Sequence, residues 1–314
     1  MQMRRTYLTY FQNFHWVHAL SLMFNLVVLP LAFSQAANKS ESVPTEDFNV
    51  NFCADQEELE PILGNDAPIA LKQLELHFRF EGRLQSRHAT LFLPQAQQAL
   101  SLVLFFNGGT ISGDRYDWLA RLVASHGFAA LMVEDQTGPS FSRLQWLPAA
   151  LEAFQDSELA TLVDTQRIIL GGHSFGGVCV FCLNHPSSCS YQGNIPSLPE
   201  NVIGFFTINS HLQSKARPEN MEVIPLSRPI LMISGTRDGY AKAETIEKTF
   251  RRLRGNKPAF LERIEGSNHF QALDCLDPNQ DRYENDNPAE ISHQAAASLI
   301  GQVLIDYLNW LVSR

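Results

Sequence analysis

The chain has 314 residues, of which 45% are hydrophobic and 18% charged, a composition that excludes a wholly disordered protein and suits one with a sizeable core. Its formal net charge is −9, and its 24 basic residues form no basic stripe. Nucleic acid and anionic membrane surfaces are therefore not expected as main partners. Length alone does not decide between one large domain and two small ones.

The first 36 residues have the pattern of a secretory signal peptide. Arg4 and Arg5 are their only charges, an apolar run extends from Ala19 to Phe33, and small residues lead to Ala36. We expect export, periplasmic or secreted, with cleavage near Ala36. The alternative is an N-terminal membrane anchor, for which the run is short. Cleavage would leave 22 basic and 33 acidic residues and thus a net charge of −11. We expect no stable membrane insertion of the mature chain.

Five cysteines follow the expected cleavage point, and an exported protein meets an oxidising compartment. The odd number leaves one of them unpaired. Cys182 with Cys189 and Cys53 with Cys275 are possible disulfides, but the sequence does not fix the connectivity. The alternative is that all five are reduced and mostly buried.

Cys179 and Cys182 also form a C-x-x-C pattern inside a predicted helix. Because neither lies at the helix N-terminus, where a cysteine pKa is lowered, core packing is favoured over redox chemistry. A zinc site with His185 would lack a fourth ligand. We expect no metal and no cofactor.

After an irregular N-terminal arm over residues 37–70, residues 71–314 read as one domain. Two strands with alternating apolar residues come first and are expected to form an antiparallel edge, at Leu74–Phe80 and Ala89–Leu93. Short apolar strands then alternate with helices. The expected strands are Leu102–Phe106, Ala129–Val133, Arg167–Leu170, Val202–Ile208, Ile230–Ile233 and Phe260–Ile264. The expected helices are Tyr116–Ser125, Ala149–Val163, Gly177–Leu183, Lys242–Leu253 and Pro288–Leu311.

Strands that are apolar almost throughout are buried on both faces, and alternation with helices implies βαβ units. The predicted fold class is therefore α/β, with a mostly parallel, twisted, eight-stranded sheet and helices on both faces. The segment Pro218–Pro229 is expected to be a surface loop between two strands.

The strongest motif is Gly172-His173-Ser174-Phe175-Gly176, a G-x-S-x-G between a predicted strand and a predicted helix. A tight strand-to-helix turn exposes the serine hydroxyl, and the flanking glycines allow strand and helix to pack closely. Ser174 is therefore the candidate nucleophile. His173 is expected to point away from it and to serve in packing.

A serine nucleophile needs a general base and an acid that orients the base, in the chain order Ser, Asp or Glu, His. Asp238, after the strand Ile230–Ile233, is the only aspartate between Ser174 and His269. His269 lies in a loop after the last strand and is the candidate base. His293 falls in an Ala-rich helical pattern, where we expect solvent exposure.

The oxyanion of a tetrahedral intermediate needs hydrogen-bond donors. The backbone N–H of Phe175 opens the helix after the nucleophile, whose positive end favours negative charge. The second donor is expected from the loop Asn107-Gly108-Gly109-Thr110, and we choose Gly109 N–H. Phe141, Trp146 and Phe175 are candidate apolar walls of the cleft, which would favour an apolar ester.

From about Leu74 to Leu311 the chain resembles the α/β-hydrolase superfamily. Residues 117–128, DWLARLVASHGF, are similar to the helix of dienelactone hydrolases, chlorophyllases, platelet-activating-factor acetylhydrolases and polyester hydrolases. The resemblance implies a carboxylic ester hydrolase that works through an acyl-serine intermediate, on a small-molecule or polymeric ester. By the same resemblance Asn107 stands where many relatives have a histidine, and His211 stands at a cleft-lining aromatic position. Asn107, Thr110 and His211 are thus candidate cleft residues.

Two alternatives remain open at this stage. One is a non-catalytic binding protein with the same fold, although all three triad positions are filled. The other is an acyltransferase that uses the same triad with an alcohol as acceptor. The sequence determines neither the natural ester nor the oligomeric state.

Overall fold

The computed structural model describes residues 68–96, 98–135, 140–155, 157–212, 223–274 and 285–314. The expected signal peptide, residues 37–67 of the expected arm, and Cys53 and Cys275 lie outside these ranges. Strand β1 begins at Ile69, so the last residues assigned to the arm belong to the sheet instead.

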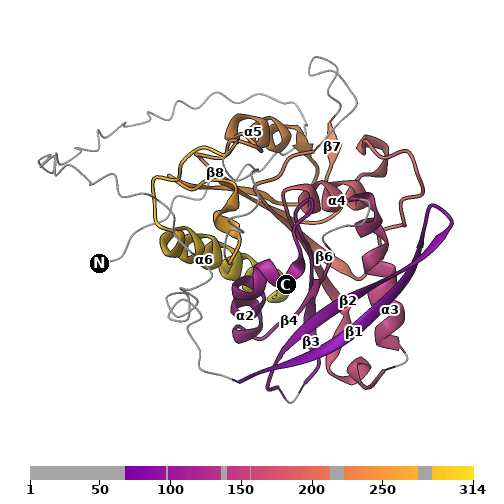
Figure 1. The fold of residues 1–314 in the computed structure, drawn as a ribbon. Helices are drawn as coiled ribbons and strands as arrows, with labels where there is room; N and C mark the ends of the chain where they lie inside the picture. The colour runs from indigo at the N-terminus through magenta and orange to yellow at the C-terminus, as the bar shows by residue number, and fades with distance from the viewer. Residues whose placement is uncertain (1–67, 97, 136–139, 156, 213–222, 275–284) are drawn as a thin grey trace, which may run out of the picture. The chain divides into compact units, whose positions relative to one another are not determined.

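The described strands form an eight-stranded sheet in the order β1-β2-β4-β3-β5-β6-β8-β10 (Figure 1). β2 runs antiparallel to both β1 and β4, and the remaining neighbours are parallel. The mostly parallel α/β sheet with an antiparallel edge is therefore confirmed. The strands are β1 Ile69–Phe80, β2 Arg83–Pro94, β3 Leu100–Phe106, β4 Ala129–Val133, β5 Val163–His173, β6 Val202–Ile208, β8 Ile230–Gly235 and β10 Ala259–Ile264.

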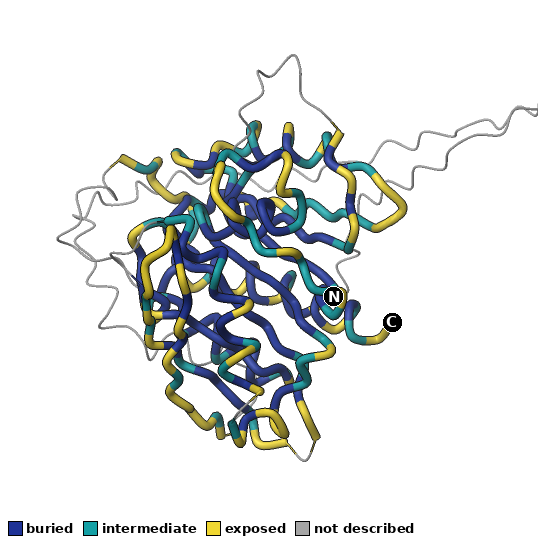
Figure 2. Tube along the Cα trace, turned by 90° about the vertical axis from the view of Figure 1, so that its right-hand side faces the viewer, coloured by how far each residue is buried: buried dark blue, intermediate teal, exposed yellow. Residues whose placement is uncertain are grey.

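Helices cover both faces of the sheet (Figure 1). α2 and α6 pack on one face, whereas α3, α4 and α5 pack on the other. Strand residues alternate between the two cores, as in β3, where Leu102 and Leu104 face α3 and α4 while Val103 and Phe105 face α2. Figure 2 shows the resulting buried interior. The helices are α2 Asp117–Ser125, α3 Trp146–Gln155, α4 Phe175–Asn184, α5 Ala243–Arg252 and α6 His293–Val312.

Two helix boundaries and one expected loop differ most from the sequence prediction. α3 ends at Gln155 rather than Val163, because the chain turns through a short 3-10 helix at Glu158–Thr161 and then enters β5. α6 begins at His293 rather than Pro288, where Ser292 caps it by accepting the Ala295 N–H. The expected loop Pro218–Pro229 contains the short strand β7, Ile224–Pro225, which pairs with β9, Leu253–Arg254.

α6 has the length and apolar composition of a membrane span, but half of its most apolar window is buried within the described fold. Gly301 lies directly against Leu122 of α2, and Leu311 lies against Gly204 of β6. His293 is 7% exposed, so its expected solvent exposure is wrong. The Ala-rich pattern did not show which side of the helix carries the histidine.

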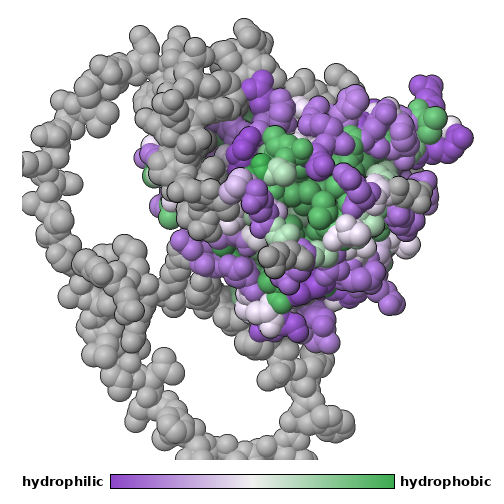
Figure 3. Space-filling model, turned by 90° about the horizontal axis from the view of Figure 1, so that it is seen from below, coloured by the Kyte–Doolittle hydropathy of each residue, from purple (hydrophilic) through white to green (hydrophobic). Residues whose placement is uncertain are grey.

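The large apolar side chains that remain exposed come from separate elements. The face seen from below is largely hydrophilic and has a hydrophobic area near its centre (Figure 3). The exposed large apolar residues among those described are Leu71, Leu84, Leu162, Val223, Tyr240 and Leu299. Of these, Tyr240 lies beside the candidate active site.

Candidate active site

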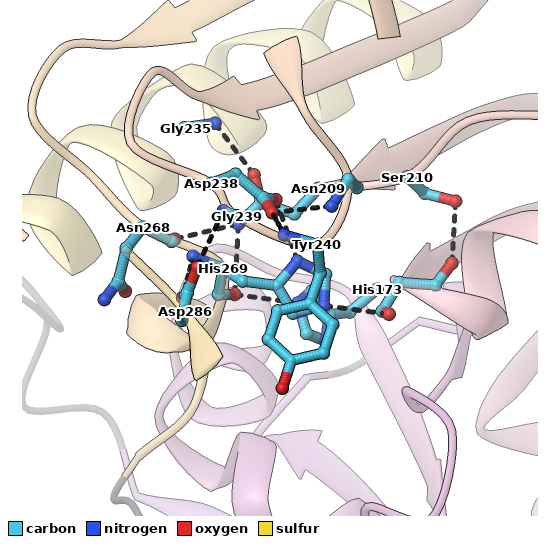
Figure 4. Close-up of polar contacts among 12 residues, drawn as sticks. His173, Asn209, Ser210, Gly235, Asp238, Gly239, Tyr240, Asn268, His269 and Asp286 are labelled. Atoms are coloured by element: carbon cyan, nitrogen blue, oxygen red, sulfur yellow. Dashed lines mark hydrogen bonds and ion pairs between the residues drawn. The ribbon is translucent and has the colours of Figure 1, made fainter. Parts of the chain in front are cut away.

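The site is assembled at the carboxyl ends of five parallel strands, β3, β5, β6, β8 and β10. Parallel strands present these ends at one edge, where ligand sites of α/β sheets lie. The loops there carry the predicted residues, which are distant in the sequence. Figure 4 shows two of them, Asp238 and His269, side by side. In chain order these residues are Gly109, Ser174, His211, Asp238 and His269.

Ser174 occupies a sharp turn between β5 and α4 with φ 51° and ψ −120°, a region rarely adopted by non-glycine residues. Its N–H donates to the Ile208 carbonyl at 3.0 Å. A side chain at Gly172 would meet the backbone of Gly176, and one at Gly176 would meet the Phe106 carbonyl. The two glycines therefore allow the strained turn that presents the serine.

The three predicted triad side chains are in hydrogen-bond contact. His269 Nε2 lies 2.9 Å from Ser174 Oγ, and His269 Nδ1 lies 2.8 Å from Asp238 Oδ2. The His269 and Asp238 side chains are 3% and 0% exposed, whereas Ser174 is only partly buried. The imidazole thus joins a buried carboxylate to a hydroxyl that solvent can reach.

The backbone fixes the second oxygen of Asp238. Oδ1 accepts the N–H groups of Tyr240 at 2.8 Å and Ala241 at 2.6 Å. The Tyr240 ring stacks on the His269 imidazole, with centroids 5.1 Å apart and planes inclined by 29° (Figure 4). Acid and base are therefore held in one orientation.

Asn209, which the sequence analysis missed, connects three of these loops. Its Nδ2 donates to the carbonyls of Asn268 and His269, both at 3.1 Å, and its Oδ1 accepts the Gly235 N–H at 2.8 Å. The neighbouring Ser210 Oγ donates to the Ser174 carbonyl at 2.6 Å. Both residues come directly after β6, which pairs with β5 and β8, the strands that lead to Ser174 and Asp238. This position in the chain was the signal that could have placed them near the site.

Asp286 is a second residue that the sequence did not indicate. Its Oδ2 accepts the His269 N–H and its Oδ1 accepts the Gly239 N–H, each at 2.7 Å. Burial raises the pKa of this carboxyl, while the two backbone donors oppose the shift. Asp286 thus joins the loop of the acid to the loop of the base.

His173 points away from Ser174, as expected, but it also makes defined hydrogen bonds. Its Nε2 lies 3.0 Å from the His269 carbonyl oxygen and its Nδ1 lies 2.8 Å from the Tyr116 hydroxyl. A carbonyl only accepts, so Nε2 carries the proton and Nδ1 accepts from Tyr116. Burial and the neighbouring His269 hold the pKa of His173 well below its usual value, which keeps the ring neutral.

The two predicted oxyanion donors lie close together. Phe175 is the first residue of α4, and a Cβ at Gly109 would stand 3.5 Å from the Phe175 Cβ. Thr110, which follows Gly109 and has a φ of 57°, is exposed. Asn107 is 1% exposed, and its Nδ2 donates to the carbonyls of Ile111 and Asp135. It therefore helps to close its own loop, and its place in the cleft remains a prediction.

His211 lies in the electrostatic neighbourhood of the triad. Burial lowers its pKa, Asp238 raises it, and His269 lowers it further. The ring is partly buried, and its Nδ1 has no hydrogen-bond partner among the residues that the structure describes. This placement is compatible with the predicted cleft position.

An aromatic row extends from Phe175 across one side of the site. Phe175 contacts Phe141 at a centroid distance of 4.9 Å, Phe141 stacks on Tyr191 at 4.8 Å, and Tyr191 stacks on Phe80 at 5.8 Å. Trp146 is not part of it. Its ring is 0% exposed and stacks on Phe106 inside the core, so its assignment as a wall is wrong.

Cys182 and Cys189 form a disulfide, one of the two predicted possibilities, which ties α4 to the short 3-10 helix Pro186–Ser188. Cys179 is free and buried, and burial raises the pKa of its thiol to about 12. The C-x-x-C cysteines are therefore not a redox pair, and Cys179 serves in packing.

Comparison with known proteins gives no family assignment for the chain. It matches no protein-family model, and no curated protein is significantly similar to it.

Proposed function

We propose that the chain is a serine hydrolase of the α/β-hydrolase superfamily that cleaves carboxylic esters without a cofactor. The contact of Ser174 with His269 at 2.9 Å, with His269 in turn 2.8 Å from Asp238, carries the proposal. The strained backbone of Ser174 and the order Ser, Asp, His support it. The mostly parallel sheet is compatible with this superfamily.

In the proposed reaction Ser174 Oγ attacks the ester carbonyl carbon while its proton moves to His269 Nε2. Asp238 remains ionised and stabilises the imidazolium that forms. The carbonyl oxygen becomes an oxyanion, which the N–H groups of Phe175 and Gly109 would bind. His269 then returns the proton to the leaving alkoxide, which departs and leaves an acyl-serine.

Water resolves the acyl-serine by the same steps. His269 removes a proton from water, the resulting hydroxide adds to the acyl carbonyl, and the proton passes to Ser174 Oγ as the acid departs. Phe141 and Phe175 provide apolar contact beside the nucleophile, which favours an uncharged ester, whether small or polymeric.

We also propose export. The pattern of residues 1–36 motivates this, and the Cys182–Cys189 disulfide fits an oxidising compartment.

The test is labelling of the purified protein with a fluorophosphonate, which phosphonylates activated serines, followed by mass mapping. Hydrolysis of p-nitrophenyl esters of graded acyl length is measured in parallel. Labelling at Ser174 with release of free acid is the expected result. Labelling with acyl transfer to an added alcohol in place of hydrolysis would indicate an acyltransferase. A folded sample that neither labels nor turns over would indicate a binding protein.

A further inference from the structure

Gly108 is held at both of its backbone polar groups. Its N–H donates to the Tyr116 hydroxyl oxygen at 2.9 Å. Its carbonyl accepts from Arg143 Nη2 at 3.1 Å and from the Ile111 N–H at 3.2 Å. A Cβ at Gly108 would lie 3.0 Å from His173 Nδ1 and 3.1 Å from the Tyr116 hydroxyl, so a side chain there would be crowded by both neighbours. The residue before Gly109 therefore has a defined orientation.

The Gly108 carbonyl and the Gly109 N–H belong to the same peptide group. A trans peptide is planar, and its C=O and N–H point in opposite directions. A donor that fixes the Gly108 oxygen therefore also fixes the direction of the Gly109 N–H. Donation from a charged guanidinium to this oxygen polarises the peptide group, which strengthens its N–H as a donor.

Arg143 is itself held firmly in the interior. It is 1% exposed, its Nη1 donates to the Ser140 carbonyl at 3.2 Å, and its guanidinium lies 5.3 Å from the Trp146 ring centre. Burial lowers the pKa of Arg143, and the nearby Asp135, which is paired with Arg87 at 3.2 Å, is one of the groups that oppose this shift.

A buried arginine is costly unless its hydrogen bonds and charge are satisfied. Here two of its donors serve backbone carbonyls, and one of those carbonyls belongs to the loop next to Ser174. This contact of Arg143 with the Gly108 carbonyl is separate from the hydrogen bonds of the triad, and the sequence did not indicate it.

We propose that Arg143 is a positioning residue of the oxyanion hole, which orients the Gly108–Gly109 peptide group so that the Gly109 N–H meets the developing oxyanion. The inference rests on the proposed function. Arg143 acts through Gly108 and touches no substrate atom.

The test compares wild type with Arg143→Ala and Arg143→Lys in the full chain, using a p-nitrophenyl ester. Loss of one oxyanion donor costs about 10²–10³-fold in kcat, so misorientation should cost Arg143→Ala about 10- to 100-fold, with KM changed less than about threefold. A trifluoromethyl ketone, which forms a hemiketal oxyanion with the serine, should lose affinity by the same factor. Millimolar guanidinium should restore part of the kcat of Arg143→Ala.

Arg87→Ala is the matched control, because Arg87 pairs with Asp135 in the same region but does not bond to the Gly108 loop. It should lower thermal stability and leave kcat near wild type. Equal kcat losses in Arg87→Ala and Arg143→Ala would overturn the proposal, as would a wild-type kcat in Arg143→Ala. If Arg143→Ala does not fold, Arg143→Met decides, because methionine keeps an unbranched apolar side chain but has no N–H donor, and wild-type kcat in that variant overturns the proposal.

The two proposals fail in different ways. Absence of turnover and labelling in the wild type refutes the hydrolase function itself. Turnover in the wild type with undiminished kcat in the Arg143 variants refutes only the positioning role.

Discussion

Asp286 holds the backbone of His269, with its Oδ2 2.7 Å from the His269 nitrogen, while its Oδ1 holds Gly239 beside the acid. One carboxylate thus sets the distance between two loops that contribute to the triad. The contact spans 17 residues of chain and involves no side-chain atom of the imidazole.

Removal of this carboxylate should impair both activity and stability. Asp286→Ala leaves three backbone N–H groups, those of Gly239, His269 and Asn287, without this acceptor, and each loss at a buried N–H costs about 1–3 kcal/mol. We expect a lower free energy of unfolding by urea denaturation and a fall in kcat of about tenfold or more. Asp286→Asn keeps one oxygen acceptor, so its free energy of unfolding and its kcat should lie between those of wild type and Asp286→Ala. Asp306→Ala, on the exposed side of α6, is the control and should match wild type in both measurements. Wild-type kcat in Asp286→Ala would show that the loops keep their spacing without it.

Asp238→Asn tests the orienting acid. An amide in place of Oδ2 would favour the wrong tautomer of His269, a change that costs about 10⁴-fold in a serine protease triad. We expect a comparable loss of kcat, together with a retained circular dichroism spectrum. Full activity would assign the role to another carboxylate, such as Glu262 or Glu265.

His293 should make the protein sensitive to acid. Burial lowers its pKa to about 4 from the usual 6.5, so the folded state binds the proton less readily than the unfolded state. The neutral ring contributes stability that is complete above pH 6.5 and is lost as the pH falls towards 4. At about 1.4 kcal/mol per pH unit, the loss amounts to roughly 3 kcal/mol.

His293→Gln should therefore flatten the stability profile between pH 6.5 and 4, measured as the urea midpoint across that range. His77→Gln, with a side chain that is 63% exposed in the wild type, is the control and should follow the wild-type profile. A His293→Gln profile as steep as the wild type would assign the acid sensitivity to other groups.

The disulfide should stabilise the helix behind the nucleophile. Cys182 and Cys189 are seven residues apart, and closure of so short a loop is worth about 2–3 kcal/mol in the chain-entropy treatment. The double variant Cys182→Ala/Cys189→Ala should unfold at lower urea while kcat at low temperature stays near wild type. Equal urea midpoints for wild type with and without reductant would contradict the prediction.

The sequence was sufficient for the sheet and the triad because both follow local rules. Buried strands have apolar runs, and Ser174 sits in a motif whose partners follow in a fixed chain order. The supporting contacts depend on tertiary neighbours and were missed. Nothing near Asn209 or Asp286 in the chain indicates that their partners lie in the loop of His269. Arg143 stands among apolar residues, but a lone arginine there does not reveal which carbonyl it reaches.

One prediction at the site was wrong. Trp146 was predicted as an apolar wall of the cleft, whereas its ring is buried in the core and stacks on Phe106. A side chain next to a functional loop can point into the cleft or into the core. The packing of the neighbouring elements decides which of the two it does.

Because a side chain at Gly176 would collide with the Phe106 carbonyl, this glycine is required by the fold whether or not the protein is catalytic. The same holds for Gly172 against the Gly176 backbone, so a descendant that lost Ser174 would still need both glycines to fold. Purifying selection on the fold alone would therefore preserve the glycines of G-x-S-x-G after the chemistry had gone. In such a lineage the glycines would indicate common ancestry only. Retained catalysis would be indicated by the serine, the aspartate and the histidine.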